Sequence, residues 1–159
     1  MAFPRRLVTA KLGAVLLLIS LIAASIGIIS PSWSKFDNIN LGIWRTCFGN
    51  NNEFRNCHLT IALHRTDLFT AAMSFVIIGV VFLFISTCAA FCATSRVVGA
   101  VLGILGGLMI FISVVLYYVN VSSKPENEIL DWGFFLSGMS GGLGFIGGLL
   151  SIPGQYQKV

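Results

Sequence analysis

The chain has 159 residues, of which 56% are hydrophobic and only 10% charged, and its formal net charge is +4. A soluble domain carries about 25% charged residues, so this composition excludes an ordinary soluble enzyme and a nucleic-acid-binding module. Four stretches hold no charged residue: 12–34, 68–95, 97–123 and 132–157. Because about 20 apolar residues cross a bilayer core as a helix, these stretches predict four transmembrane spans.

The four spans predict a single membrane domain over residues 1–159, an all-α transmembrane four-helix bundle. The spans are expected at about 12–30, 68–91, 97–119 and 132–152, with extracellular loops at about 31–67 and 120–131. No span contains Asp, Glu, Lys, Arg or His, the residues that mark proton relays and transport paths within membranes. We therefore expect neither an enzyme nor a transporter, and no catalytic residue, metal site or cofactor.

An even number of spans places both termini on one side of the membrane. Lys and Arg favour the cytoplasmic side, and the side with the termini holds five basic and no acidic residues: Arg5, Arg6, Lys11, Arg96 and Lys158. The opposite side also holds five basic residues, so the number of Lys and Arg residues indicates the cytoplasmic side only weakly. The short basic flank before the first span favours cytoplasmic termini in a multi-pass protein of the plasma membrane.

The first loop, 31–67, carries most of the polar residues. Ile39, Leu41 and Ile43 alternate with polar or small residues, which is the period of a half-buried strand. A Gly-Asn-Asn-Asn turn follows at 49–52, and 53–59 is long enough to return as a strand. We expect a small extracellular antiparallel sheet of two or three short strands, which is marginally stable by itself.

Two cysteines flank that turn, as the halves of an inter-strand disulfide would. Cys47 and Cys57 lie in the loop assigned to the oxidising side, where a bridge of this length contributes roughly 2–3 kcal/mol in the chain-entropy model. Two free thiols are the alternative. A zinc site with His58 and His64 fits no standard ligand spacing.

Two further sites are candidates for covalent modification. Cys88 and Cys92 share a helix face at the cytoplasmic end of the second span, where juxtamembrane cysteines are candidates for palmitoylation. The alternative is that they are plain small apolar residues. Asn120 begins an Asn-Val-Ser glycosylation sequon, but it lies so near the bilayer that a transferase would reach it with difficulty.

Small residues indicate how the spans pack. In lipid, helices associate where small side chains let backbones approach. The third and fourth spans carry such residues at helical spacing: Gly99, Gly103, Gly107, Gly138, Gly142, Gly144 and Gly148. Packing within one bundle is the first interpretation, and contact with a partner's transmembrane helix is the alternative. The fourth span has glycines on more than one face and would allow both.

The first loop resembles the signature of a known family. Trp33 is followed after ten residues by Trp44, after two more by Cys47 and after nine more by Cys57. Together with Gly42, this resembles the W…GLW…C…C signature of the claudin superfamily. That superfamily includes claudins, peripheral myelin and epithelial membrane proteins, and calcium-channel gamma subunits.

Other features are similar to the family as well. Arg65, before the second span, resembles an arginine that many claudins carry there, and 131–134 resembles the aromatic-glycine-aromatic start of the fourth helix. Ile43 stands where the family usually has Leu. In length and spacing the chain is closest to the short epithelial membrane protein branch.

The resemblance implies a fold and a function. It implies a left-handed bundle, Trp33 and Trp44 at the base of the sheet near the membrane, and a Cys47–Cys57 bridge. It further implies a non-enzymatic role in cell–cell contact, junctions or membrane organisation through the first loop. The alternative is an auxiliary subunit of an ion channel or receptor, bound through that loop and the glycine-rich helix faces.

The partners implied are membrane lipid and other membrane proteins. The protein partner is either another copy of the chain, in the same or the opposite membrane (in cis or in trans), or a channel or receptor. No nucleic-acid partner is expected. Val159 ends the chain as many claudin PDZ ligands end. Gln157 is neither a hydroxyl nor an apolar residue at the third-last position, so PDZ binding is a weak expectation.

Overall fold

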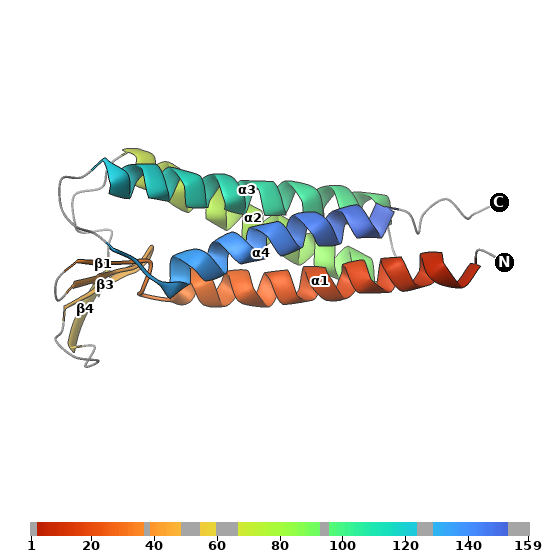
Figure 1. Ribbon diagram of the computed structural model, residues 1–159, viewed down its shortest axis with the longest axis horizontal. Coiled ribbons are helices and arrows are strands. Elements are labelled where there is room, and N and C mark those ends of the chain that lie inside the picture. The colour runs from red at the N-terminus through yellow and green to blue at the C-terminus, as the bar shows by residue number, and fades with distance from the viewer. Residues whose placement is uncertain are drawn as a thin grey trace.

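The computed structural model describes residues 3–36, 39–48, 55–59, 67–92, 96–123 and 129–152. Four long helices form a bundle (Figure 1): α1 (Phe3–Ile29), α2 (Asp67–Cys92), α3 (Arg96–Ser122) and α4 (Trp132–Ser151). Each is long and apolar enough to cross a membrane, which confirms the prediction of four spans. The α1 helix begins nine residues earlier than the expected span at 12, because the basic residues before it are good helix formers.

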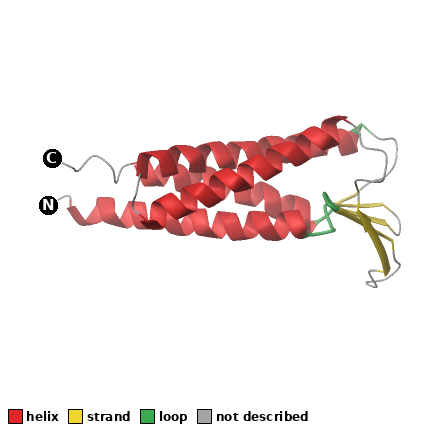
Figure 2. Cartoon of the chain, turned by 180° about the vertical axis from the view of Figure 1, so that it is seen from behind, coloured by secondary structure: helices red, strands yellow, loops and turns green. Residues whose placement is uncertain are grey.

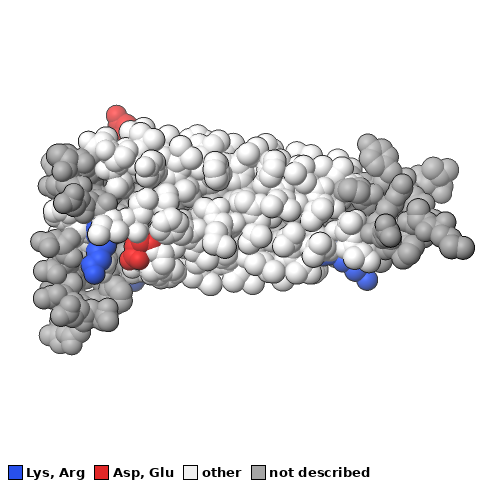
Figure 3. All heavy atoms as spheres, viewed as in Figure 1, with Lys and Arg blue, Asp and Glu red and all other residues white. Residues whose placement is uncertain are grey.

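The helices pack in a ring. In this ring α1 lies along α4, α4 along α3 and α3 along α2, and a looser contact between α2 and α1 closes it. Across the ring, α2 barely meets α4. The start of α1 and the end of α4 lie at one end of the bundle and the sheet at the other (Figure 2). On the face drawn in Figure 3, charged side chains lie near the two ends and none on the middle. Large apolar side chains are exposed around the helices, among them Ile22, Phe111 and Met139. Such a surface suits acyl chains rather than water.

A five-stranded antiparallel sheet stands on the end of the bundle away from the termini (Figure 1). Its strands are β1 (Ser34–Phe36), β2 (Ile39–Leu41), β3 (Arg45–Phe48), β4 (Arg55–Leu59) and β5 (Ile129–Leu130), in the order β4-β3-β2-β1-β5. The expected antiparallel sheet is present, but the expected number of two or three strands is wrong. The fifth strand comes from the second loop, so the sheet is built from both loops.

The alternating pattern predicts a strand up to Ile43, and this prediction is also wrong at the C-terminal end of the strand. The β2 strand stops at Leu41, and the chain turns so that the Gly42 N–H donates to the Arg45 carbonyl at 2.9 Å. Ile43 lies at the tip of this turn and is fully buried. Its burial therefore comes from a turn inserted among helices and not from one face of a strand.

The helices approach one another at glycines. A Cβ atom added at Gly107 would lie 2.5 Å from the Phe145 backbone nitrogen and 2.6 Å from the Gly141 carbonyl oxygen, so α3 and α4 are in backbone contact there. Four more of the predicted glycines also face a neighbouring helix within the bundle: Gly99, Gly103, Gly144 and Gly148.

The last two predicted glycines differ from these five. A Cβ atom at Gly138 would be in ordinary contact with Val114 Cγ1 of α3 at 3.7 Å, and one at Gly142 would meet nothing within 4 Å. Gly142 thus has open space beside it, whereas the five close-approach positions are filled by the bundle itself.

Buried serine hydroxyls join the helix pairs. Ser20 donates to the Ser140 carbonyl at 2.8 Å, which links α1 to α4, and Ser113 donates to the Ala72 carbonyl at 2.7 Å, which links α3 to α2. A third bond runs from Ser86 to a carbonyl of α3 at 2.6 Å. Such bonds add modest stability in lipid, about 0.6 kcal/mol each on average.

Candidate functional site

Trp33 connects the sheet to the helices. Its side chain is fully buried, and its Nε1–H donates to the Gly27 carbonyl at 2.7 Å. That carbonyl lies in the last turn of α1, where an α-helix would pair it with the amide of residue 31. Residue 31 is Pro31, which has no N–H, so the indole supplies the missing donor. The Trp33 side chain is thereby fixed by the end of α1.

The backbone of Trp33 bonds to both loops. Its N–H donates to the Leu41 carbonyl at 2.9 Å, and its carbonyl accepts from the Asp131 N–H at 3.0 Å. The first bond extends the β1–β2 pairing, and the second continues the β1–β5 pairing towards α4. One residue therefore holds α1, the sheet and the start of α4 in a single arrangement.

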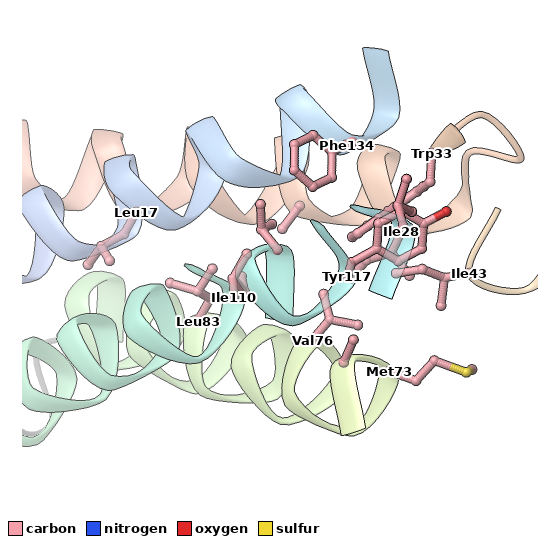
Figure 4. Close-up of a cluster of buried hydrophobic side chains, with 14 residues drawn as sticks. Leu17, Ile28, Trp33, Ile43, Met73, Val76, Leu83, Ile110, Tyr117 and Phe134 are labelled. Atoms are coloured by element: carbon pink, nitrogen blue, oxygen red, sulfur yellow. The ribbon is translucent and has the colours of Figure 1, made fainter. Parts of the chain in front are cut away.

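An aromatic cluster surrounds the indole (Figure 4). The Trp33 ring meets Tyr117 edge-on at 5.0 Å and Phe134 at 6.2 Å, and Tyr117 lies 6.0 Å from Phe69. The Tyr117 hydroxyl also shares a buried 2.9 Å hydrogen bond with the Ser34 hydroxyl. Side chains from all of α2, α3 and α4 thus pack around the base of the sheet.

The turn between β2 and β3 inserts two large apolar residues towards this cluster. Ile43 is fully buried beside the bundle (Figure 4), and the half-buried Trp44 packs against the same core. Gly42 makes this insertion possible, since a Cβ atom there would lie 2.7 Å from Pro31 Cα and 2.8 Å from the Ser30 carbonyl oxygen. A larger residue would push the turn away from the end of α1.

The start of α4 is fixed against the same segment. The Asp131 side chain accepts from the Trp132 N–H at 2.8 Å and caps the helix. The Gly133 N–H donates to the Ser32 carbonyl at 3.0 Å, and a Cβ atom at Gly133 would lie 2.6 Å from that oxygen. Glycine is required there by the close approach of the two backbones.

A disulfide joins the edge strand β4 to its neighbour β3. Cys47 on β3 and Cys57 on β4 are directly opposite in the register, with a Cα–Cα distance of 4.1 Å. Cys47 is 2% exposed, whereas Cys57 is exposed. The bridge thus fixes the edge strand β4 to β3, the strand that directly follows the buried turn at Ile43.

The residues predicted from the sequence fall into separate places. Trp33, Gly42 and Trp44 meet at the base of the sheet, and the disulfide lies farther out. Cys88 and Cys92 are exposed on α2, in its last turns. Arg65, His64 and Val159 lie outside the described residues.

Asn120, the sequon residue, lies inside α3 and is 5% exposed. A glycan on that side chain would have to displace the packing around it, so the fold gives the glycosylation prediction no support.

Some residues of this junction carry no signal in the sequence. Tyr117 lies in an apolar run where any aromatic residue is expected to face lipid, and only its contacts distinguish it, whereas Phe134 belongs to the 131–134 motif. The same absence of a signal holds for three close-approach glycines that the small-residue patterns do not include: Gly13, Gly79 and Gly106. Among the described residues, no three His, Cys, Asp or Glu side chains gather as a metal site would require.

Comparison with models of known protein families finds none that matches the chain, and comparison with curated proteins finds no match either. The likeness to the claudin superfamily therefore depends on the motif residues and on what the fold does with them.

Proposed function

We propose that this chain is a claudin-like, non-enzymatic tetraspan protein of the plasma membrane, with both termini in the cytoplasm. It acts in cell–cell contact, junctions or membrane organisation through its disulfide-stapled sheet. The motif residues Trp33, Gly42 and Trp44 support this proposal, because they join the sheet rigidly to the bundle. A sheet held in this way presents the same surface to every neighbour.

The observation that carries the proposal is the open side of β4. The strand order begins with β4, so no described strand pairs with its outer side. Unpaired backbone groups at a sheet edge are a template for a strand of another chain. The disulfide holds β4 in place, and Leu59 leaves 59% of its surface exposed beside that edge.

The register identifies which amides point outward. The Gly42–Arg45 hydrogen bond directs the backbone of Arg45 towards β2, and backbone groups alternate in direction along a strand. Thr46 therefore faces β4, and its partner His58 faces back towards β3. The neighbouring amide of Leu59 consequently faces the open edge.

This geometry provides a test with a matched control. Leu59→Pro removes the outward N–H and leaves the β3–β4 ladder intact, because proline is tolerated at strand edges. Leu59→Thr removes the apolar side chain but keeps the N–H. In cells that lack junctions, the tagged wild type and Leu59→Thr should concentrate at contacts between expressing cells, and Leu59→Pro should spread evenly at equal surface level. Equal enrichment of Leu59→Pro at contacts would contradict edge pairing.

A second candidate function is that of an auxiliary subunit of an ion channel or receptor. Gly142 favours it, because a Cβ atom there would meet nothing within 4 Å, so a partner's transmembrane helix could approach α4 closely. Gly142→Leu places its Cβ atom where nothing lies within 4 Å and its branched side chain where a partner's helix would lie. For a subunit, this variant should lose a co-purified membrane partner while Leu59→Pro retains it, and for a contact protein the outcomes should be reversed.

A further inference from the structure

The α1 helix reaches beyond α4 at the end of the bundle away from the sheet (Figure 1). A Cβ atom at Gly13 would lie 2.6 Å from Ser151 Oγ, so Gly13 is level with the last residue of α4. Residues 3–12, the α1 arm, therefore project past the end of α4. At 1.5 Å per residue, the arm is about 15 Å long.

The helix lengths place the α1 arm outside the hydrocarbon core. The α4 helix has 20 residues and is about 30 Å long, which is the thickness of the core. The opposite end of α1 is level with the start of α4, because a Cβ atom at Gly27 would lie 3.4 Å from the Gly133 carbonyl oxygen. The 27 residues of α1 are about 40 Å long, so the excess length of α1 lies at the arm. The arm therefore crosses the headgroup layer and continues into water.

Positive charge is distributed along the axis of the α1 arm. The arm contains Arg5, Arg6 and Lys11 and no acidic residue. Lys11 is exposed and precedes Gly13 by two residues, which places it about 3 Å beyond the hydrocarbon boundary. The backbone of Arg5 and Arg6 lies about 10–12 Å beyond that boundary. The charges thus begin at the level of the lipid phosphates and continue outward.

A fourth basic residue lies at the level of Lys11. A Cβ atom at Gly103 would lie 2.9 Å from Leu17 Cδ2, so these positions of α3 and α1 are level. Arg96 begins α3 seven residues before Gly103, and both helices run antiparallel to α4. The backbone of Arg96 is therefore level with the turn of α1 that holds Lys11. Among the described residues, acidic side chains occur only at the other end, where α2 and α4 begin.

We propose that the α1 arm binds the headgroup of a polyphosphorylated inositol lipid in the cytoplasmic leaflet. The inference rests on the cytoplasmic orientation proposed above, since basic residues beside a transmembrane helix attract the anionic lipids of that leaflet. Phosphatidylserine holds its charge close to the bilayer surface, whereas phosphates on an inositol ring carry charge farther out, towards Arg5 and Arg6. Arg and Lys donate strong hydrogen bonds to phosphate oxygens. The spread of charge along the arm therefore favours the inositol lipid over phosphatidylserine.

The test measures binding of a fluorescent short-chain phosphatidylinositol bisphosphate to the purified full chain in micelles, by fluorescence polarisation. Two basic residues near an anionic headgroup contribute about 30-fold in affinity. Arg5→Gln/Arg6→Gln should weaken binding by about that factor, and glutamine keeps the helix propensity. The matched control Lys35→Gln/Arg45→Gln removes two exposed charges at the sheet and should bind as the wild type does. Arg5→Lys/Arg6→Lys keeps the charge and should retain binding.

Two competitors identify the source of the phosphates. Unlabelled phosphatidylinositol bisphosphate should displace the fluorescent lipid, whereas phosphatidylserine at equal total charge should displace it poorly. Soluble inositol trisphosphate should also compete poorly, because it is not concentrated at the micelle surface. Displacement by inositol trisphosphate at the concentration of the bisphosphate lipid would overturn the proposal and assign the arm to a soluble phosphate.

The remaining outcomes are decisive as well. Equal binding by Arg5→Gln/Arg6→Gln and Lys35→Gln/Arg45→Gln would show that the α1 arm does not hold the headgroup, and equal competition by phosphatidylserine would refute the argument from charge spacing. Binding in micelles does not depend on which way the chain crosses a membrane. Antibody labelling of a terminal tag on intact cells tests the orientation separately, so failure of lipid binding is distinguishable from failure of the topology.

Discussion

The backbone contact at Gly107 allows a direct test of how the bundle is held together. Gly107→Ala would place a methyl group 2.5 Å from one backbone atom of α4 and 2.6 Å from another, neither of which can rotate away. Overpacking a core by one such group typically destabilises by about 1–3 kcal/mol. Gly142→Ala adds the same methyl group where nothing lies within 4 Å.

Both substitutions also gain helix propensity, about 0.8–1 kcal/mol for glycine to alanine as measured in water. Because that gain is common to both, the difference between the two variants isolates the overpacking effect. We expect Gly107→Ala to be less stable than Gly142→Ala by about 1–3 kcal/mol, which is about a 5- to 150-fold difference in the folding equilibrium.

The assay is reversible unfolding of the purified protein in mixed micelles, followed by tryptophan fluorescence, since the buried Trp33 ring becomes solvated on unfolding. Because nothing lies within 4 Å of a Cβ atom at Gly142, the free energy of unfolding of Gly142→Ala should equal or exceed that of the wild type. Equal stability of the two variants would refute the inference that α3 and α4 are held by backbone contact at this glycine.

Three further predictions follow from the sheet and its base. Trp33→Phe leaves the Gly27 carbonyl without its indole donor and should destabilise by at least about 1–3 kcal/mol in the same unfolding assay; a change below about 0.5 kcal/mol would contradict the role of that bond. The double variant Cys47→Ala/Cys57→Ala should weaken the sheet by about 2–3 kcal/mol, seen as faster hydrogen exchange in β4 with α1 to α4 unchanged. An epitope at Asn51 should bind antibody on intact cells and terminal epitopes only after permeabilisation, and the reverse pattern would overturn the proposed orientation.

The sequence predicts the helices well because charge is excluded from lipid, so the charge-free runs mark the spans. It cannot predict which neighbour a residue meets. Gly107 and Gly142 belong to equivalent small-residue patterns, yet one contacts a backbone and the other faces outward. Helical periodicity tells which residues share a face, and the order of helices around the bundle decides what that face touches.

The sheet shows the same limit. The alternation at 39–43 predicts a strand, but burial of Ile43 at the tip of a turn produces the same pattern of apolar residues. The β5 strand has two residues, too few for any periodicity, and only its pairing with β1 defines it. Trp33 and Gly42 were found by a spacing pattern, whereas Tyr117 required the folded arrangement.

The pairing of β1 with β5 imposes an order on biosynthesis. Ser34 pairs with Leu130, so the sheet cannot be completed until the segment just before α4 has been synthesised and lies on the same side of the bundle as β1. Until then β1 presents an unpaired edge, the kind of surface that promotes aggregation. A chain that ended before residue 129 would keep that edge open permanently. Completion of this small sheet thus requires that the chain has been made through its first three helices and up to the start of α4.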